Sequence, residues 1–305
     1  MTRIEVTFLG TTAAIPTKYR NHAAIYVTYR SENEFSYLWD CGEGTQRQIF
    51  TAGLNFMRLN EIFISHWHAD HFAGLLGLLE TMSLENRQKQ LSIFAPEAER
   101  FVPSLTNLGY STKDFPIVAK SVYHDGSSIQ TLVDEQEFQI QSMPMRHGIP
   151  AVAYALVEKD RIKIDSEKAK KLGLPEKGPI FRTLKENGEA VFKGQKIRLE
   201  DVSNITKGKK VVYSGDTLVN RNMLKLAENA DLLIHDSTFF AEMKEEGYKH
   251  ATFEDVIKLA KEASVKQVVL THISRRYQDI QELKEKISKH ENVRIAKDFM
   301  KVVVE

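Results

Sequence analysis

Apolar and polar residues alternate in short runs along this chain, and the runs predict strands with helices between them. Residues 4–9 alternate and stop at Gly10, which is typical of a half-buried strand. Residues 24–29 and 35–39 are apolar runs on either side of a polar turn, so they predict two more strands. Similar runs predict strands at 62–64, 91–95, 138–144, 210–214, 231–235 and 267–270. Helical spacing predicts helices at 46–52, from about 72 to 84, from about 97, and at 253–263 after an N-cap at Thr252.

Length and composition favour one domain, residues 1–305, that carries an inserted segment. The chain has 305 residues, of which 42% are hydrophobic, and this is enough to bury a full core. From about residue 157 to residue 202, proline, glycine, lysine and glutamate break the periodicity. We therefore interpret residues 157–202 as an insertion into the domain.

Four potential metal ligands follow the strand at 62–64 within six residues: His66, His68, Asp70 and His71. A helix is expected to begin at about residue 72, so all four lie on one strand-to-helix loop. Neutral imidazole and carboxylate suit zinc and similar divalent ions, and ligands this close together can serve two adjacent coordination shells. The alternative is a polar loop with chance histidines, but unpaired polar groups at a buried strand end are costly. The pattern favours a metal site.

Further ligand-type residues follow other predicted strands. His147 follows the strand at 138–144, Asp216 follows the strand at 210–214, and His272 follows the strand at 267–270. A lone histidine is more often a core or surface residue with an ordinary hydrogen bond. Each of these three residues, however, lies just after a predicted strand, as the first four do. If the strand ends share one edge of packed sheets, a single cleft collects seven side chains: His66, His68, Asp70, His71, His147, Asp216 and His272.

The insertion is basic, although the whole chain has a formal net charge of only +1. Residues 159–185 contain nine Lys or Arg against four Asp or Glu, an excess of +5 that leaves −4 on the remainder. A basic arm on a mildly acidic body is suited to hold a polyanion away from the metal site. The alternative is a solvated loop with ordinary lysines.

Cysteine content and hydropathy indicate the compartment. Cys41 is the single cysteine, which excludes an internal disulfide and a cysteine-rich zinc cluster and fits a reducing compartment. We expect Cys41 to be a small buried residue. The chain starts without a charged and apolar leader, and no apolar run approaches the ~18 residues that span a bilayer. We therefore expect a cytoplasmic protein that does not bind membranes.

The histidine motif with a later histidine, aspartate and histidine resembles the metallo-β-lactamase superfamily. Other stretches are similar to one of its branches, the ribonuclease Z family of tRNA 3′-end processing endonucleases. Residues 16–21 resemble that family's Pro-x-Lys-x-Arg-Asn loop, and residues 40–46 resemble its glycine-rich turn. By itself such a turn indicates a tight connection at least as well as a phosphate contact. The likeness covers nearly the whole chain.

Three further stretches carry the resemblance. Residues 235–238 stand where the family usually has His-Glu-Ala-Thr, with the shorter Asp236 in place of the glutamate. Residues 250–252 stand where it has a His-Ser-Thr type motif, and Lys177-Gly178-Pro179 resembles part of its protruding arm. The resemblance implies an α/β fold, a four-layer αββα sandwich with an inserted tRNA-binding arm, and a homodimer whose arms reach the partner's substrate.

The resemblance also implies the chemistry: zinc-dependent removal of the 3′ trailer from precursor tRNA, which leaves a 3′-hydroxyl on the tRNA. Two zinc ions are expected, one held by His66, His68 and His147, the other by Asp70, His71 and His272, with Asp216 bridging them. Asp70 is the expected general base, and His250, oriented by Asp236, is expected to protonate the leaving 3′ oxygen. The expected substrate contacts are Lys18, Arg20, Lys177, Gly178 and Pro179.

Two other classes of function are compatible with the metal-ligand pattern or the fold. A hydrolase of the same fold acting on a small phosphodiester, sulfate ester or lactone would not need the basic arm. A non-catalytic nucleic-acid-binding subunit would lack metal ligands, whereas all seven are present. For His250 the structural alternative is a hydrogen bond at a helix terminus.

Overall fold

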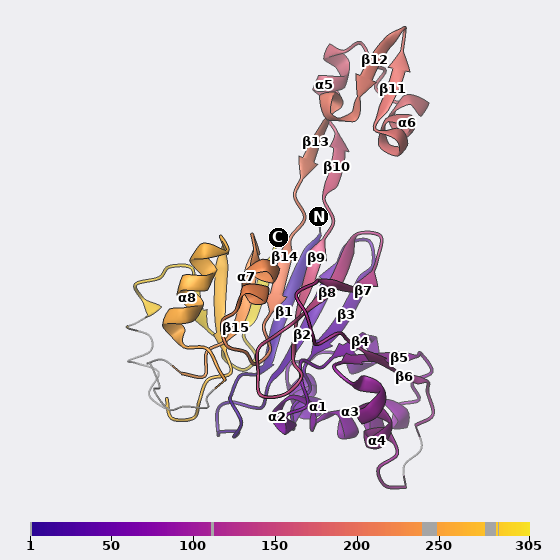
Figure 1. Cartoon of the computed structure of the whole chain (residues 1–305). Coiled ribbons are helices and arrows are strands. Elements are labelled where there is room, and N and C mark those ends of the chain that lie inside the picture. The colour runs from indigo at the N-terminus through magenta and orange to yellow at the C-terminus, as the bar shows by residue number, and fades with distance from the viewer. Residues whose placement is uncertain (1, 111–112, 240–248, 278–284, 286) are drawn as a thin grey trace. The chain divides into compact units, whose positions relative to one another are not determined.

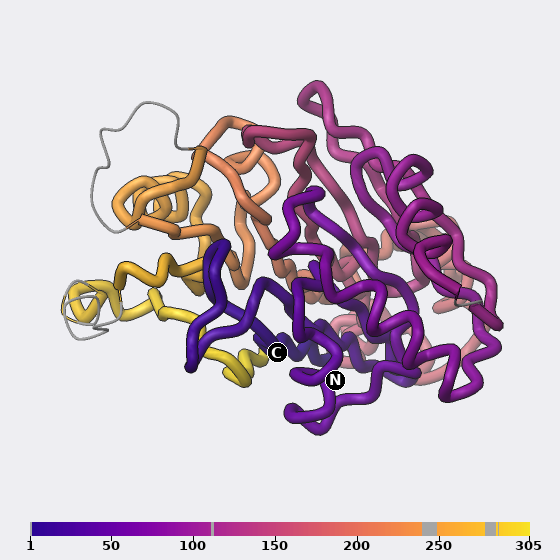
Figure 2. Tube along the Cα trace, turned by 90° about the horizontal axis from the view of Figure 1, so that it is seen from below, coloured from indigo at the N-terminus to yellow at the C-terminus, as the bar shows by residue number. Residues whose placement is uncertain are grey.

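The computed structural model describes residues 2–110, 113–239, 249–277, 285 and 287–305. Within these ranges two seven-stranded sheets form the body of the protein (Figure 1). The first and last strands of the chain pair antiparallel, with Ile4 opposite Val304, so the two ends of the chain lie close together (Figure 2).

The first sheet is antiparallel at one side and parallel at the other. β1 pairs antiparallel with β18 and β2, β2 pairs antiparallel with β3, and β3 to β6 run parallel. In spatial order the strands are β18 (Lys301–Val304), β1 (Arg3–Gly10), β2 (Ala24–Arg30), β3 (Glu34–Trp39), β4 (Leu59–Phe63), β5 (Leu91–Ala95) and β6 (Ile117–Ser121).

The second sheet contains four parallel strands, β14 to β17, which follow one another in the chain. β7 and β8 form an antiparallel pair at its other edge. In spatial order the strands are β17 (Val293–Ile295), β16 (Gln267–Thr271), β15 (Leu232–Asp236), β14 (Lys210–Tyr213), β9 (Val152–Glu158), β8 (Phe138–Pro144) and β7 (Gln130–Asp134).

The two sheets pack face to face over a shared apolar core. The rings of Tyr37 in β3 and Phe138 in β8 lie 6.1 Å apart, and those of Phe63 in β4 and Tyr154 in β9 lie 5.2 Å apart. All four residues are buried, so water is excluded between the sheets.

Helices cover the outer face of each sheet (Figure 1). A second apolar cluster joins the helices of the first sheet to its outer face. Those helices are α1 (Thr45–Thr51), η1 (Phe56–Arg58), α2 (Ala69–Phe72), α3 (Leu75–Leu84) and α4 (Ala98–Thr106). The second sheet carries α7 (Arg221–Ala227) and α8 (Phe253–Glu262), and Thr252 caps α8 as predicted. The order helix, sheet, sheet, helix confirms the four-layer αββα sandwich.

The helix after the histidine motif differs from the prediction. It was expected to begin at about residue 72 and run unbroken to residue 84, but α2 already begins at Ala69, and a break at Gly74 separates it from α3. At Gly74 the backbone passes so close to the glycine-rich turn that a Cβ atom would lie 2.1 Å from the Gly42 carbonyl oxygen. Asp70 and His71 therefore lie in a helical turn, not in the loop that the sequence predicted.

Residues Val157–Lys209 form a separate compact unit, which we call the arm unit. It contains β10 (Arg161–Ile164), α5 (Ser166–Lys171), α6 (Pro179–Asn187), β11 (Glu189–Phe192), β12 (Gln195–Arg198), η2 (Leu199–Val202) and β13 (Ser203–Thr206). Five buried apolar residues form its core: Ala169, Leu174, Leu184, Ile197 and Val202. Because β13 pairs with β10, the unit extends beyond residue 202. These elements are too short to show a clear period in the sequence.

None of the helices in the described ranges is both long enough and apolar enough to cross a bilayer.

Candidate active site

The histidine motif supplies one side of the site. His66 and His68 follow β4, while Asp70 and His71 lie in α2. His66 and His71 are fully buried, whereas Asp70 is half-buried and His68 is exposed. The motif therefore places two histidines in the interior and two ligand-type side chains, His68 and Asp70, nearer to solvent.

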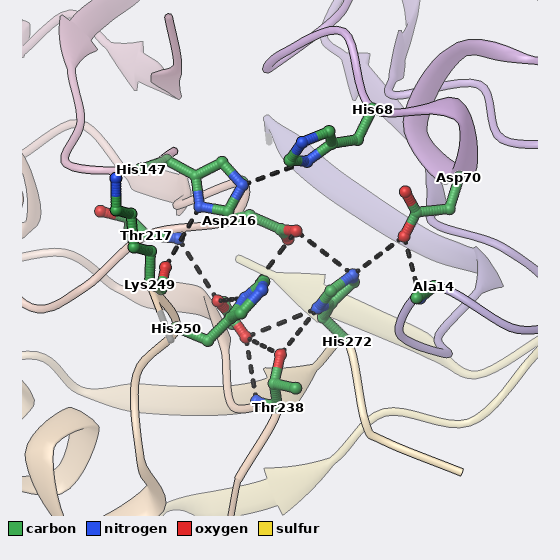
Figure 3. A network of polar contacts seen from close by, with 12 residues as sticks. Ala14, His68, Asp70, His147, Asp216, Thr217, Thr238, Lys249, His250 and His272 are labelled. Carbon is green, nitrogen blue, oxygen red and sulfur yellow. Dashed lines mark hydrogen bonds and ion pairs between the residues drawn. The ribbon is translucent and has the colours of Figure 1, made fainter. Parts of the chain in front are cut away.

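The ends of three further strands supply the other side. His147 follows β8, Asp216 follows β14, and His272 follows β16. Asp216 and His272 are buried, and His147 is half-buried. Figure 3 shows His68, His147, Asp216 and His272 pointing toward one another from these separate segments. The structure thus gathers all seven side chains that the sequence singled out.

The first group of ligand-type atoms lies around His68. Its Nδ1 is 3.0 Å from His66 Nε2 and 3.2 Å from His147 Nε2, and His66 Nε2 is 3.7 Å from Asp216 Oδ2. Two nitrogen atoms on one tetrahedral zinc, at 2.0–2.1 Å each, are roughly 3.3 Å apart. The three imidazoles have the spacing that one such ion requires.

The second group shares Asp216 with the first. His71 Nε2 and His272 Nε2 lie 3.4 Å apart, and each is 3.3 Å from Asp216 Oδ2. Asp70 Oδ2 lies 3.3 Å from His272 Nε2 and 3.6 Å from His71 Nε2. The same Asp216 oxygen therefore belongs to both groups.

Hydrogen bonds orient four of the histidine rings so that Nε2 points into the cluster. The Nδ1 atom of each ring contacts an oxygen outside the cluster, which leaves Nε2 facing inward. The pairs are His66 with Ser65 Oγ at 3.0 Å, His71 with Asp40 Oδ2 at 2.7 Å, His147 with the Lys249 carbonyl at 3.1 Å, and His272 with Thr238 Oγ1 at 2.8 Å.

The charges of the site also fit bound cations. Burial lowers the pKa of His66 well below its usual value, so the ring is in the neutral form that binds metals. Against the opposing effect of burial, Asp216 raises the pKa of His272 to about 10. The buried Oδ1 of Asp216 has no hydrogen-bond partner among the residues that the structure describes. A buried carboxylate oxygen without a partner is the kind of group that a bound cation would satisfy.

His250 lies beside the cluster but makes a different contact. Its Nδ1 donates to Asp236 Oδ2 at 2.8 Å, so the shorter side chain at position 236 does reach the histidine. Asp236 also accepts hydrogen bonds from Thr217 N and from the N–H and hydroxyl of Thr238. Although burial opposes it, the charge of Asp236 raises the pKa of His250. His250 is thus held in one orientation, and its charged form is favoured.

Asp40, in the turn at residues 40–46, contacts the site, although the sequence pattern did not predict this. Its carboxylate is fully buried and accepts hydrogen bonds from His71 Nδ1 at 2.7 Å, from the Tyr213 hydroxyl at 2.6 Å and from Ser65 N at 2.7 Å. It therefore positions one histidine directly and the loop before His66 through Ser65. A carboxylate that directly follows a predicted strand was the available signal.

The Asp40→Asn variant is expected to bind metal about 10–100-fold more weakly, because the carboxylate that orients His71 is replaced by an uncharged amide. Competition with a chromogenic chelator measures this affinity. Asp231→Asn is the matched control, since Asp231 is also a buried aspartate but contacts Lys210 and Lys266. Unchanged affinity in the Asp40 variant would show that this carboxylate does not support the site.

The two expected contacts in the loop at 16–21 have different surroundings. Lys18 is exposed, and its ammonium lies 5.5 Å from the centre of the Tyr19 ring. Arg20 is half-buried, and its Nη1 donates to Thr11 Oγ1 at 2.6 Å and to the Ala296 carbonyl at 2.7 Å. Lys18 is available to a ligand, whereas Arg20 holds the loop against the body.

In the arm unit, the residues Lys177, Gly178 and Pro179 are exposed at the start of α6. An open hollow of about 1300 Å³ lies between α5 and α6. Its lining includes the cations Lys170, Lys177, Arg182 and Lys185, together with Phe181 and Leu174. Glu167, Glu176 and Glu186 line the same hollow, so its surface is mixed in charge with a small excess of cations.

The fold and the clustered histidines and aspartates define a member of the metallo-β-lactamase-fold proteins. A family profile described as a beta-lactamase superfamily domain matches residues 199–273, and one described as anti-Pycsar protein Apyc1 matches residues 4–164. The metallo-beta-lactamase fold protein YhfI from Bacillus subtilis is similar in structure, with a TM-score of 0.67 at 20% identity over 99% of this chain and 100% of that one.

Full-length comparisons narrow the class. Ribonuclease Z of Archaeoglobus fulgidus is 39% identical over 98% of this chain and 97% of its own length. Ribonuclease Z of Methanosarcina acetivorans is 38% identical over 99% and 98%. The crystal structure of human tRNase Z, short form, has a TM-score of 0.69 at 29% identity and 98% coverage of both chains. The chain belongs to the ribonuclease Z family.

Proposed function

We propose that this chain is a zinc-dependent endoribonuclease that removes the 3′ trailer from precursor tRNA. The products are a tRNA with a 3′-hydroxyl and a trailer with a 5′-phosphate. The observation that carries the proposal is the likeness to ribonuclease Z along the full chain, arm unit included, together with the seven clustered side chains. Incubation with a 3′-extended tRNA, with and without a chelator, and mapping of the cut test it.

Two sets of residues are proposed to hold the zinc ions. His66, His68 and His147 form one set, Asp70, His71 and His272 form the other, and Asp216 joins them. When bound, two such ions lower the pKa of a water molecule toward neutrality and neutralise charge on the scissile phosphate.

Asp70 and His250 are proposed to move protons on the two sides of the scissile bond. Asp70 is the half-buried carboxylate at the solvent side of the cluster, so it can accept the proton of the attacking water. Asp236 holds the Nδ1–H of His250, and in its charged form the ring carries a second proton on Nε2, which it can donate to the departing 3′ oxygen. Asp236 contributes by keeping the His250 ring in one orientation and by stabilising its charged form.

RNA contacts are proposed at two places, the loop with Lys18 and the arm unit. The arm unit contains fourteen Lys or Arg and nine Asp or Glu, a net charge of +5 within a chain of +1. Lys177, Gly178 and Pro179 are exposed in this unit, and the first two line the hollow between α5 and α6. Phosphates held there would position a folded tRNA, whereas a small ester would gain nothing from them.

Removal of the arm unit is expected to weaken binding of precursor tRNA roughly 10–100-fold and to make the remaining binding less dependent on salt. Each lost phosphate contact lowers the slope of log affinity against log salt by about 0.7–0.9. The ends of the unit are adjacent, since Glu158 N donates to the Lys209 carbonyl at 2.8 Å, so a short linker can replace it. The site residues lie outside the unit, so hydrolysis of a small activated phosphodiester should persist.

Two double variants that keep the arm unit test whether its removal acts through lost charge or through a disturbed fold of the body. The double variant Lys170→Ala with Lys177→Ala keeps the arm unit, while Lys261→Ala with Lys289→Ala removes two exposed lysines elsewhere. Only the first pair should lower the salt slope. Unchanged tRNA affinity after removal of the arm unit would show that its basic residues contact only solvent and do not bind RNA. If the wild-type protein hydrolyses the small ester but does not cut tRNA, a small-ester hydrolase would be favoured.

The proposal includes a cytoplasmic homodimer in which the arm unit of one chain reaches the substrate of the other. It rests on the resemblance to the short form of the family. Light scattering of the purified protein measures the mass in solution and checks the dimer.

A further inference from the structure

The loop between β1 and β2 contacts the Asp70 carboxylate through its main chain. The N–H of Ala14 donates to Asp70 Oδ2 at 2.9 Å, and Figure 3 shows this contact beside the one from His272. Ala14 has a φ of 51°, in the left-handed region that a residue with a side chain adopts only when its surroundings hold it there. A neighbouring group must therefore fix this residue.

The side chain of His22 contacts Ala14. Its Nε2 lies 3.2 Å from the Ala14 carbonyl oxygen, so in the tautomer protonated at Nε2 the ring donates to it. The histidine itself has little room to move: a Cβ atom at Gly10 would lie 1.6 Å from the His22 carbonyl oxygen, and one at Gly42 would lie 2.5 Å from the His22 Cβ. The backbone and Cβ of His22 are thus packed closely against Gly10 and Gly42, and its ring contacts the loop at Ala14.

The same loop is tied to the strand end that carries His272. Ala13 N donates to the Ile273 carbonyl at 3.1 Å, and Ile273 N donates to the Thr11 carbonyl at 3.0 Å. Ala14 is therefore placed by contacts on both sides, with the body at Ile273 and with His22.

These contacts make the two oxygens of Asp70 unequal. Oδ2 accepts from Ala14 and lies 3.3 Å from His272 Nε2, while no described residue donates a hydrogen bond to Oδ1. A carboxylate whose one oxygen is held cannot rotate to exchange the two. We propose that His22 is a positioning residue for Asp70: it keeps the Ala14 N–H on Oδ2, so that Oδ1 is presented to the proton that Asp70 accepts.

This inference deepens the proposed function and rests on the role of Asp70 in it. Lys18, the expected RNA contact, lies in the same loop four residues after Ala14. The effect of His22 is on the reacting carboxylate and not on RNA binding, so it should act on large and small substrates alike.

Two substitutions separate the hydrogen bond from the packing. His22→Phe keeps a ring but has no donor, whereas His22→Gln keeps an N–H near the position of Nε2. With bis(p-nitrophenyl) phosphate and with 3′-extended tRNA, the Phe variant should lose roughly 5- to 10-fold in kcat at unchanged KM. The Gln variant should retain most of the rate. Full kcat in the Phe variant, or an equal loss in both variants, would overturn the inference.

A second measurement does not depend on catalysis. Exchange of the Ala14 amide hydrogen, followed in the metal-free protein, should be slow in the wild type and in His22→Gln and at least about tenfold faster in His22→Phe. Bound metal and the midpoint of thermal unfolding should be the same in all three proteins. Unchanged exchange in the Phe variant, or a parallel loss of metal, would overturn the positioning role.

The same experiments distinguish a wrong tRNA assignment from a wrong role for His22. A wild-type protein that hydrolyses the small diester but does not cut the tRNA precursor contradicts the proposed function, yet the small diester and the amide exchange still test His22.

Discussion

The Asp70→Ala variant is expected to cleave no precursor tRNA even where part of the metal remains bound. Asp70 is the single half-buried carboxylate in the cluster, next to His71 and His272, and it accepts the Ala14 N–H on one oxygen. Its removal takes away a metal ligand and a proton acceptor together. Single-turnover cleavage of 3′-extended tRNA, with metal content measured by mass spectrometry, gives the result.

Companion variants separate the two roles. Asp70→Asn keeps the size and one ligating oxygen, so it should retain more metal than Asp70→Ala yet remain inactive. His68→Ala should lose metal and activity together, because His68 Nδ1 lies within 3.2 Å of two other ligand nitrogens. His290→Ala, a histidine that packs on Phe253 outside the cluster, is the control. Full cleavage by a demonstrably metal-free protein would end the metal assignment.

The second large effect is expected at His250. His250→Ala should retain bound metal but lose about 10²–10⁴-fold in the rate of tRNA cleavage, because the leaving 3′ oxygen then departs without a proton. The geometry supports this separation of roles, since Nδ1 of His250 contacts Asp236 at 2.8 Å and lies 3.9 Å from Asp216. Rate and metal content of the same preparation are measured side by side.

A substrate with a better leaving group shows whether His250 acts as a general acid. The p-nitrophenolate ion leaves without protonation, so His250→Ala should reduce hydrolysis of bis(p-nitrophenyl) phosphate far less than cleavage of tRNA. Equal losses on both substrates would contradict the role of a general acid. Loss of zinc in parallel with activity would instead make His250 a ligand, an assignment for which Asp216, Asp236 and His272 lie close enough.

Several parts of the site followed from local sequence. The run from His66 to His71 is short enough that its residues must lie together, whatever the rest of the chain does. His147, Asp216 and His272 each follow a strand that a simple apolar run marks, and Asp216 and His272 follow strands of the parallel set β14 to β17, whose ends meet at one edge. The N-cap at Thr252 is also a local feature, since its hydroxyl bonds to the backbone three residues on. The residue types, spacing and full-length resemblance also determined the family and the sandwich.

Other features depended on contacts between distant segments, which no local pattern encodes. Asp40 orients His71 from 31 positions away, and its bond to the Tyr213 hydroxyl spans 173 positions. The Ala14 contact with Asp70 joins residues 56 apart, and His22 gains its role only because that loop folds back against it. The break before α3 lies at Gly74, where the backbone packs closely on Gly42. Sequence determined which groups the site contains, and tertiary packing decided how each is oriented, because orientation depends on hydrogen bonds to residues that are remote in the chain.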